Sequence, residues 1–233
     1  MRFSGHVLAS NIVPPQLKAH ALTTMAGAMT HRSLPLFRTH HALRIKGFAK
    51  TEVVAVVAGH DLETTQQHLL QLQDSGHAQF REVRSLWQLT PAGSEAHAAL
   101  LGEDTAHLAP TSLAHIYGPF LSLHERFKVL CGAFQLRDGV VNDHSDEAYD
   151  AAIVAGLVAL DSEVHPIAIA IGHEFERFAH YSVRLAETCQ RVINAETNMF
   201  AGLMCGSYHD VWMELHEDLI LTQGIDRAQE RSF

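Results

Sequence analysis

Histidines are the residues of this chain whose number and spacing first suggest chemistry. Eighteen of the 233 residues are histidine, and some recur seven positions apart, as in His173 with His180 and His209 with His216. Seven residues make two helical turns, so both members of a pair would lie on one face, roughly 10 Å apart along the axis. One metal ion cannot bind both members of such a pair directly. A site would need one histidine from each of several helices, with His173, His209 and His216 as the candidates. Such pairs also arise by chance among so many histidines, so we expect no metal and no cofactor.

A second candidate site lies in residues 208–219. Apolar side chains at helical spacing would face a core there, and Asp210, Glu214 and Glu217 would form an acidic outer face. An apolar pocket between helices could bind a small molecule. The candidate lining residues are Phe127, Cys131, Phe178, Tyr208 and Trp212. Aromatic side chains at this spacing are also typical of an ordinary core, and that interpretation stays open.

The familiar catalytic motifs do not occur in the sequence. There is no glycine-rich phosphate loop, no G-x-S-x-G elbow, no C-x-x-C pair and no H-E-x-x-H helix. We therefore expect no catalytic residues and do not expect an enzyme.

Charge divides the chain into two halves with different properties. Residues 1–110 carry nine Lys or Arg against eight Asp or Glu, whereas residues 111–233 carry eight against eighteen. An acidic half would repel a nucleic-acid backbone, so any DNA contact must come from the N-terminal half. No segment approaches the roughly 18 uninterrupted apolar residues of a membrane span, and the three widely spaced cysteines fit a reducing compartment. We expect a cytoplasmic protein without a membrane partner.

Residues 36–101 have the turn and capping signals of short, closely connected elements. The predicted elements are helices ending at Gly47 and Gly59, a helix over 62–74, strands over 78–82 and 86–89, a wing over 83–85 and a helix from Pro91. Asp61 can cap the helix over 62–74 through its carboxylate, and Thr90 can cap the helix that Pro91 begins. This order predicts a helix-turn-helix followed by a winged hairpin.

The segment 69–101 carries a pattern typical of a known family. Its sequence, LLQLQDSGHAQFREVRSLWQLTPAGSEAHAALL, combines a helix that ends at a glycine, a short hairpin and an LTPAG entry into the next helix. It resembles the winged helix-turn-helix of MarR-type transcription regulators, over roughly residues 36–101. The resemblance implies that the helix over 62–74 enters the DNA major groove. The wing departs from the usual MarR pattern, because it offers only Arg81 and Arg84 and no acidic-basic cluster at its tip.

The predicted recognition helix is polar but contains no Lys or Arg. The candidates for contacts with bases are Thr64, Thr65, Gln66, Gln67 and His68. Contacts with the DNA phosphates would then have to come from basic residues outside this helix, namely Arg44, Lys46, Lys50, Arg81 and Arg84. Residues 35–100 balance six bases against six acids, so a winged helix that docks a protein partner without binding DNA stays an alternative.

The C-terminal half is predicted to be entirely helical. Apolar residues repeat at spacings of three and four from Phe120 to Phe134, and further helices are predicted over 149–160, from Pro166 to about 194, and over 208–222. They suggest an antiparallel bundle, similar to the helical domain that follows the winged helix in some MarR-like bacterial regulators. The predicted organisation is an N-terminal extension at 1–34, a winged helix at 35–101, a linker at 102–118 and a helical domain at 119–233.

Together these features predict a mainly α protein, with an N-terminal winged helix-turn-helix and a C-terminal all-α helical bundle. We expect a transcription regulator that binds double-stranded DNA as a homodimer, while the bundle senses a small-molecule effector or forms the dimer interface. A shift of a few ångströms between two recognition helices would break their match to half-sites about 34 Å apart. The alternatives are the protein-docking adaptor and a metal-dependent enzyme built in the bundle.

Overall fold

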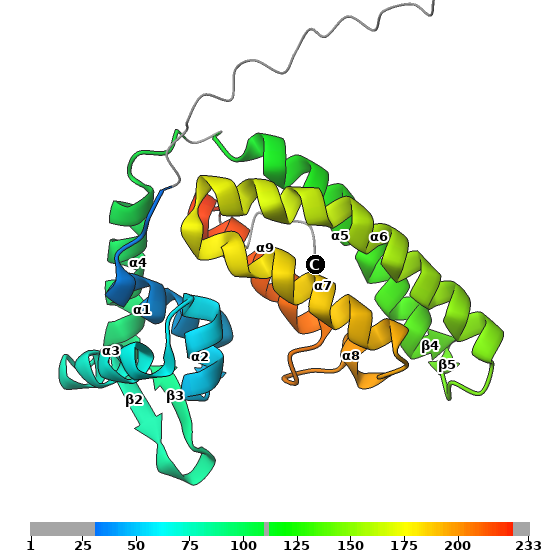
Figure 1. Cartoon of the computed structure of the whole chain (residues 1–233), viewed down its shortest axis with the longest axis horizontal. Helices are drawn as coiled ribbons and strands as arrows, with labels where there is room; N and C mark the ends of the chain where they lie inside the picture. The colour runs from blue at the N-terminus through cyan, green and yellow to red at the C-terminus, as the bar shows by residue number, and fades with distance from the viewer. Residues whose placement is uncertain (1–30, 110–111, 226–233) are drawn as a thin grey trace, which may run out of the picture.

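The computed structural model describes residues 31–109 and 112–225, and this part of the protein is mainly helical with two small sheets (Figure 1). The extension predicted at residues 1–34 therefore falls, apart from its last four residues, outside the described part. An N-terminal half built on a small sheet lies beside a C-terminal half made of longer helices (Figure 1).

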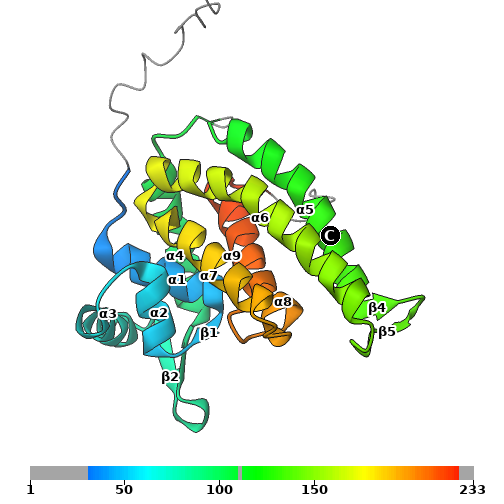
Figure 2. The same cartoon turned by 45° about the vertical axis from the view of Figure 1, so that its right-hand side comes forward.

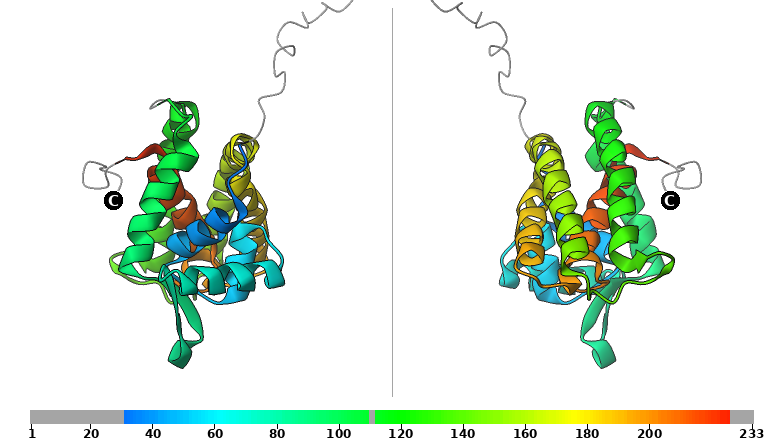
Figure 3. Two further views of the ribbon diagram at one scale, coloured as in Figure 1. Left: turned by 90° about the vertical axis from the view of Figure 1, so that its left-hand side faces the viewer. Right: turned by 90° about the vertical axis from the view of Figure 1, so that its right-hand side faces the viewer.

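The N-terminal half alternates short helices with the strands of one sheet. Its elements are α1 (Pro35–Lys46), β1 (Phe48–Ala49), α2 (Thr51–Ala58), α3 (Leu62–Asp74), β2 (Ala78–Arg81), the short 3-10 turn η1 (Glu82–Arg84), β3 (Leu86–Leu89) and α4 (Pro91–Thr105). The strands form an antiparallel sheet in the order β1-β3-β2, with Phe80 opposite Trp87. The hairpin of β2 and β3 projects from the body of the protein (Figures 2 and 3).

Local signals position these elements as the sequence predicts. The Asp61 carboxylate accepts a hydrogen bond of 2.7 Å from the backbone N–H of Thr64 and so caps α3. Thr90 caps α4 in the same way, accepting a bond of 2.9 Å from the Gly93 N–H. Gly93 also allows close packing, because a Cβ there would lie 1.9 Å from the carbonyl oxygen of His77.

One hydrophobic core holds the N-terminal half together. Leu43 of α1, Val54 of α2 and Leu69 of α3 are fully buried, and Trp87 of β3 packs against them. Burial of side chains of this size typically stabilises a fold by about 1.5–3 kcal/mol each. The core therefore fixes α2 and α3 against the sheet.

The C-terminal half contains the longest helices. Its elements are α5 (Ala114–Gln135), β4 (Leu136–Arg137), β5 (Val140–Val141), α6 (Glu147–Glu174), the 3-10 turn η2 (Glu176–Phe178), α7 (Ala179–Ile193), α8 (Asn198–Ala201) and α9 (Tyr208–Gln223). α6 packs against both α5 and α7, and α7 packs against α9 (Figure 1). The all-helical prediction is therefore confirmed except for the β4–β5 hairpin.

The helix predicted to begin at Pro166 does not begin there. α6 continues through Pro166 to Glu174. Pro166 and Ser162, whose carbonyl loses its N–H partner, are both exposed, so the lost bond faces solvent instead of the core. The break falls instead at Phe175, whose extended backbone forms a bridge with His31.

The connection between the halves is shorter than the predicted linker at 102–118. α4 continues to Thr105, and α5 begins at Ala114. The last turn of α4 is held because Asp104 accepts a hydrogen bond of 3.0 Å from Ser33 and lies 2.8 Å from Nε2 of His31. These contacts also place residues 31–34 within the fold, so the prediction that they belong to a weakly structured extension is wrong.

α6 is, by length and composition alone, apolar enough to cross a membrane. Core helices of soluble proteins pass the same test. Leu157, Leu160, Val164 and Ile171 of α6 are fully buried in the core of the C-terminal half. A single helix of this kind is weak support for a membrane protein.

Candidate nucleic-acid interface

α3 offers fewer outward side chains than its sequence predicted. Thr65 is fully buried, and its hydroxyl donates a bond of 2.8 Å to the carbonyl oxygen of Asp61. The prediction that Thr65 faces outward is therefore wrong. The reason is helical geometry, because position 65 lies one turn before the buried Leu69 and shares its inward face.

Two further candidates on α3 are held by neighbouring elements. His68 Nδ1 lies 2.8 Å from the Thr39 hydroxyl, and burial, reinforced by the neighbouring His60, lowers the pKa of His68. The amide oxygen of Gln66 accepts a bond of 3.2 Å from Thr51. Both side chains help to hold α3 against α1 and α2. To contact a DNA base, His68 would have to break its bond with Thr39, and Gln66 its bond with Thr51.

Gln67 is the most accessible of the predicted base-contacting residues. Its side chain is exposed, and its amide nitrogen lies 3.5 Å from Glu63 one turn earlier. Thr64 is half-buried, and its hydroxyl donates a bond of 2.9 Å to Asp61. The outward face of α3 thus presents an amide beside a carboxylate.

The β2–β3 hairpin and the residue before α2 carry accessible basic side chains. Arg81 and Arg84 are exposed, as is Lys50 immediately before α2. Val83 at the tip is fully exposed, and Ser85 adopts a positive φ of 51° to close the turn. All three basic side chains are accessible, with the Arg81 guanidinium lying against the Gln88 amide, whereas α3 itself carries no Lys or Arg.

The other two predicted phosphate contacts point at the C-terminal half. Lys46 forms an ion pair with Glu214 of α9, and Arg44 lies 3.2 Å from Glu217. Arg184 of α7 also binds Glu214, at 2.6 Å. The prediction that Glu214 and Glu217 form an outer acidic face is therefore wrong, because that face covers the end of α1. Asp210 instead accepts hydrogen bonds from the backbone N–H groups of residues 204–206.

A buried ionic cluster joins the two halves beside these pairs. Asp218 of α9 is 1% exposed and forms an ion pair with Arg177 of η2. Its Oδ1 also lies 2.9 Å from Nε2 of His41 on α1, and Nδ1 of His41 lies 2.9 Å from Nε2 of His97 on α4. Tyr181 of α7 donates a bond of 3.2 Å to the same carboxylate. We call Asp218, Arg177, His41 and His97 the junction cluster.

The charges of the junction cluster follow from its burial. Burial alone would raise the pKa of Asp218, but Arg177 and His41 outweigh it and hold that pKa below its usual range. Burial lowers the pKa of His41, and it lowers the pKa of His97 to about 2, helped by the neighbouring His41. The lowered pKa values favour the neutral form of both rings. Nε2 of a neutral His41 either donates to Asp218 or accepts from Arg177, whose Nη1 lies 3.1 Å away, and its Nδ1 takes the complementary role toward Nε2 of His97.

Sequence reasoning did not identify the junction cluster. One signal was present, since Asp218 interrupts an inward stripe formed by Val211, Leu215 and Thr222 at spacings of four, three and four. A charged residue on a buried stripe needs a buried partner. The partners come from α1, α4 and η2, so no local pattern could name them.

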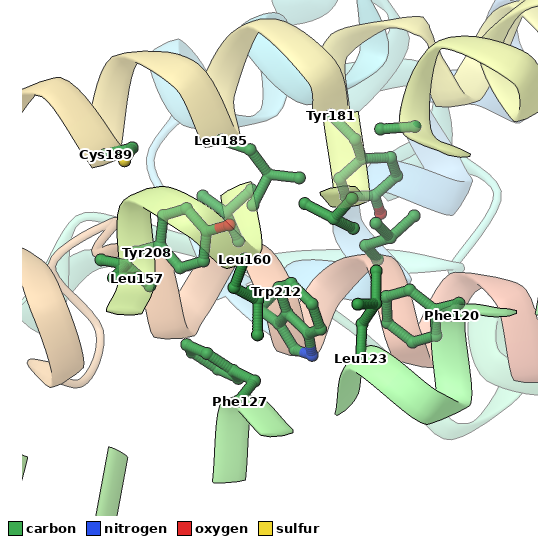
Figure 4. Packing of buried hydrophobic residues seen from close by; sticks show 14 of the residues in the cluster. Phe120, Leu123, Phe127, Leu157, Leu160, Tyr181, Leu185, Cys189, Tyr208 and Trp212 are labelled. Atoms are coloured by element: carbon green, nitrogen blue, oxygen red, sulfur yellow. The ribbon is translucent and has the colours of Figure 1, made fainter. Parts of the chain in front are cut away.

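The residues predicted to line a ligand pocket pack against one another instead. Phe127, Phe178, Tyr208 and Trp212 are almost completely buried, and Cys131 is half-buried at the edge of the same core. Trp212 lies between Phe120 and Phe127, with ring centroids at 5.1 and 4.6 Å (Figure 4). Its indole N–H donates a bond of 3.0 Å to His124. The second interpretation of the sequence, an aromatic core, is the correct one.

The candidate metal ligands are not brought together. His173 is exposed near the end of α6, His209 packs on Phe127, and His216 packs inside against His124. Among residues 31–109 and 112–225, no group of three or more His, Cys, Asp or Glu side chains is arranged to hold a metal ion.

Comparison of the chain with protein-family models, with curated proteins and with solved structures finds no match.

Proposed function

We propose that the N-terminal half is a winged helix-turn-helix that binds double-stranded DNA, and that the protein is a cytoplasmic transcription regulator acting as a homodimer. The observation that carries the proposal is the order of α1, β1, α2, α3, β2 and β3 with the sheet order β1-β3-β2. This order leaves a capped helix on one surface and an exposed hairpin beside it, the two parts that winged helices use on DNA. The MarR-like sequence pattern supports the same assignment.

The accessible side chains suggest how contacts would be divided. Gln67 can donate to and accept from the edge of an adenine, which is the pairing that glutamine side chains favour in the major groove. Lys50, Arg81 and Arg84 would supply the phosphate contacts, because each is exposed. Because α3 itself carries no Lys or Arg, binding would depend on two protomers acting on adjacent half-sites.

The junction would connect the C-terminal half to DNA binding. Glu214 and Glu217 hold Lys46 and Arg44, so the orientation of the winged helix depends on α9. A change in the helical half that moves α9 would alter the spacing of two recognition helices or release these two bases.

The test is a fluorescence polarisation titration of the full-length protein with the DNA upstream of its own coding sequence, at two salt concentrations. Arg84→Ala should weaken binding about threefold to tenfold on every sequence and flatten the salt dependence. Gln67→Ala should reduce discrimination between the site and scrambled DNA, by up to about tenfold. Arg191→Ala is the matched control, since Arg191 is an exposed base on α7 paired with Glu196. Binding without sequence selectivity or salt dependence would exclude the proposal.

A second candidate function is a protein-docking adaptor. The observation that favours it is the exposure of apolar side chains on α2, α3 and the wing, namely Val56, Leu62, Leu70 and Val83. Such a surface beside a helix without bases suits a protein partner. In the polarisation titration the adaptor would show no DNA binding at low salt, whereas the regulator would.

A further inference from the structure

The sheet of the N-terminal half has one face turned away from its core. The register places Phe48 of β1 opposite Gln88 of β3, and Gln88 opposite Gln79 of β2. Directly paired residues point to the same side of a sheet, so these three side chains form one row. The next residues along the strands, Ala49 and Trp87, are buried in the core. The row therefore lies on the outer face, at the base of the hairpin that projects from the protein (Figure 2).

Arg81 continues this outer face toward the end of the hairpin. It lies two residues beyond Gln79 on β2, opposite Leu86, and therefore points to the same side as the row. With the Gln88 amide oriented to satisfy its neighbours, its oxygen accepts bonds from Nη2 and Nε of Arg81, at 3.0 and 3.2 Å, and from the Gln79 amide. These bonds hold the guanidinium against the sheet. A guanidinium has five N–H donors, so Arg81 can bind an anion without losing this contact.

A pocket of about 540 Å³ lies along this face. Its described lining residues belong to β1 and the β2–β3 hairpin, so it lies within the N-terminal half. Phe48 contributes a ring that is 48% exposed, and Gln88 contributes its amide. The charged residues of this described lining are Arg81, Arg84 and Glu82, which leaves an excess of positive charge. A volume of this size is typical of sites that bind a metabolite-sized molecule.

An exposed ring, an amide and two arginines suit a nucleotide. The flat face of a base stacks on an aromatic side chain, whatever the base. The amide nitrogen of Gln88 can donate to a carbonyl on the edge of that base. Arg81 and Arg84 can bind the phosphate through charge-assisted hydrogen bonds. In a DNA duplex the faces and edges of each base are already stacked and paired, so only an unpaired base can lie on Phe48.

We propose that the outer face of the β1–β3–β2 sheet binds an unpaired nucleotide, with its base on Phe48 and its phosphate at Arg81 and Arg84. The nucleotide is either free or part of a single DNA strand, and both sources present the same base and phosphate. The site goes beyond the proposed contact with double-stranded DNA. It shares the two arginines with that contact, whereas Phe48 and Gln88 belong to this site alone.

The experiment measures fluorescence polarisation of a labelled thymidine oligonucleotide of about ten nucleotides, which forms no duplex with itself, with the full-length protein. We expect saturable binding that weakens as the salt concentration rises. Phe48→Leu keeps the apolar bulk but removes the aromatic face, so it should weaken binding about tenfold, whereas Phe48→Trp should preserve it. In Phe48→Trp the fluorescence of the introduced indole should also be quenched by the stacked base. The matched control is Val56→Ala, because Val56 is exposed on α2 outside the pocket lining.

Arg81→Gln should weaken binding of the oligonucleotide and flatten its salt dependence, because one phosphate contact is lost. Unlabelled thymidine 5′-monophosphate separates the two sources. Displacement of the oligonucleotide at an equal concentration of nucleotides would support a free nucleotide as the ligand, and binding of the oligonucleotide without displacement would support a single strand.

Three results would overturn the site or limit the conclusion to it. No binding of either ligand, or equal binding in Phe48→Leu and Val56→Ala, would overturn the site. If Phe48→Leu weakened binding of the double-stranded upstream DNA as much as that of the oligonucleotide, the assignment of an unpaired base would be wrong. Failure of duplex binding with the oligonucleotide results intact would overturn the proposed regulator and leave the nucleotide site standing.

Discussion

The outer surface of the N-terminal half and its junction with the C-terminal half use basic side chains in opposite ways. Lys50, Arg81 and Arg84 lie in solvent, whereas Arg44 and Lys46 are paired with carboxylates of α9. All five are equivalent in the sequence, where each is a base near a predicted helix-turn-helix. The comparison teaches that the charge available to a polyanion depends on which bases the rest of the chain has already paired. One molecule therefore contains both exposed charges, whose interactions are screened by solvent, and buried ion pairs, whose loss is costly.

The largest effect should come from removing the carboxylate of the junction cluster. Asp218→Ala leaves Arg177 charged and buried without its main partner, and we expect a loss of about 3–5 kcal/mol in the free energy of unfolding. Urea denaturation followed by circular dichroism measures it. Glu163→Ala, which removes an exposed partner of Arg126, should lower the free energy of unfolding far less, because solvent screens that pair. Similar costs for the two variants would contradict the contrast between buried and exposed pairs.

Acidification should weaken the junction through its neutral histidines. The pKa values of His41 and His97 are lowered in the folded protein, whereas unfolded histidine titrates near 6.5. The unfolded chain therefore takes up protons first as the pH falls below about 6.5, and stability is lost on acidification. His97 alone should remove about 1 kcal/mol between pH 6.5 and 5.5, and His41 should add to that loss in the same direction. Asp218 does not contribute in this window, because its lowered pKa matters only below the unfolded value near 3.9.

Urea denaturation at pH 7.5, 6.5 and 5.5 measures this dependence. His97→Gln should remove the part of the loss that His97 contributes, about 1 kcal/mol between pH 6.5 and 5.5. His115→Gln is the control, because His115 is exposed on α5 and should leave the slope almost unchanged. A slope that is the same in both variants would show that the junction histidines are not its source.

Removing an acid that pairs with α1 should make DNA binding tighter, if the protein binds DNA as proposed. Glu217→Gln leaves Arg44 without its carboxylate partner, and we expect about threefold to tenfold tighter binding in the polarisation titration. Glu196→Gln is the control. It changes the net charge by the same amount, but Glu196 pairs with Arg191 of α7 and not with a residue of α1. An equal gain in both variants would mean that net charge, and not the release of Arg44, causes the effect.

The smallest effect should come from the cap of α3. Asp61→Ala removes the acceptor for the Thr64 N–H, which should lower the free energy of unfolding by much less than Asp218→Ala does. Urea denaturation measures it, and Asp61→Asn should recover most of the loss, since asparagine is an equally good cap. A cost as large as that of Asp218→Ala would mean that Asp61 does more than cap a helix.

The N-terminal elements could be predicted closely because their limits are set by neighbours in sequence. α2 and α3 begin and end where the prediction placed them, since Asp61 and Gly59 act on residues within one turn. Prediction failed where a distant contact decided the outcome. Pro166 should begin a helix by local rules, but the buried face of α6 carries the helix past it, and the break falls where His31 pairs with Phe175.

The candidate site was predicted only in part, for the same reason. The polarity of α3 and the bases of the wing are visible in the sequence, and Gln67, Arg81 and Arg84 are indeed exposed. The burial of Thr65 follows from the orientation of α3 against Leu43 and Trp87 in the shared core. Sequence spacing indicates which face of a helix points inward. It does not decide whether a polar residue at the border of that face, such as Thr65, is buried or exposed.

The sequence by itself determined the helical content, the caps, the hairpin between Arg81 and Leu86 and the charge difference between the halves. Only the tertiary structure decided that Glu214, Glu217 and Asp218 face α1, and that Arg44, Lys46 and His41 meet them there. Capping and periodicity act within a few residues, whereas these ion pairs join positions more than 160 residues apart. These distant pairs matter because they are buried. In a low-dielectric junction a charge that loses its partner is strongly destabilising, and the partner is brought there only by packing.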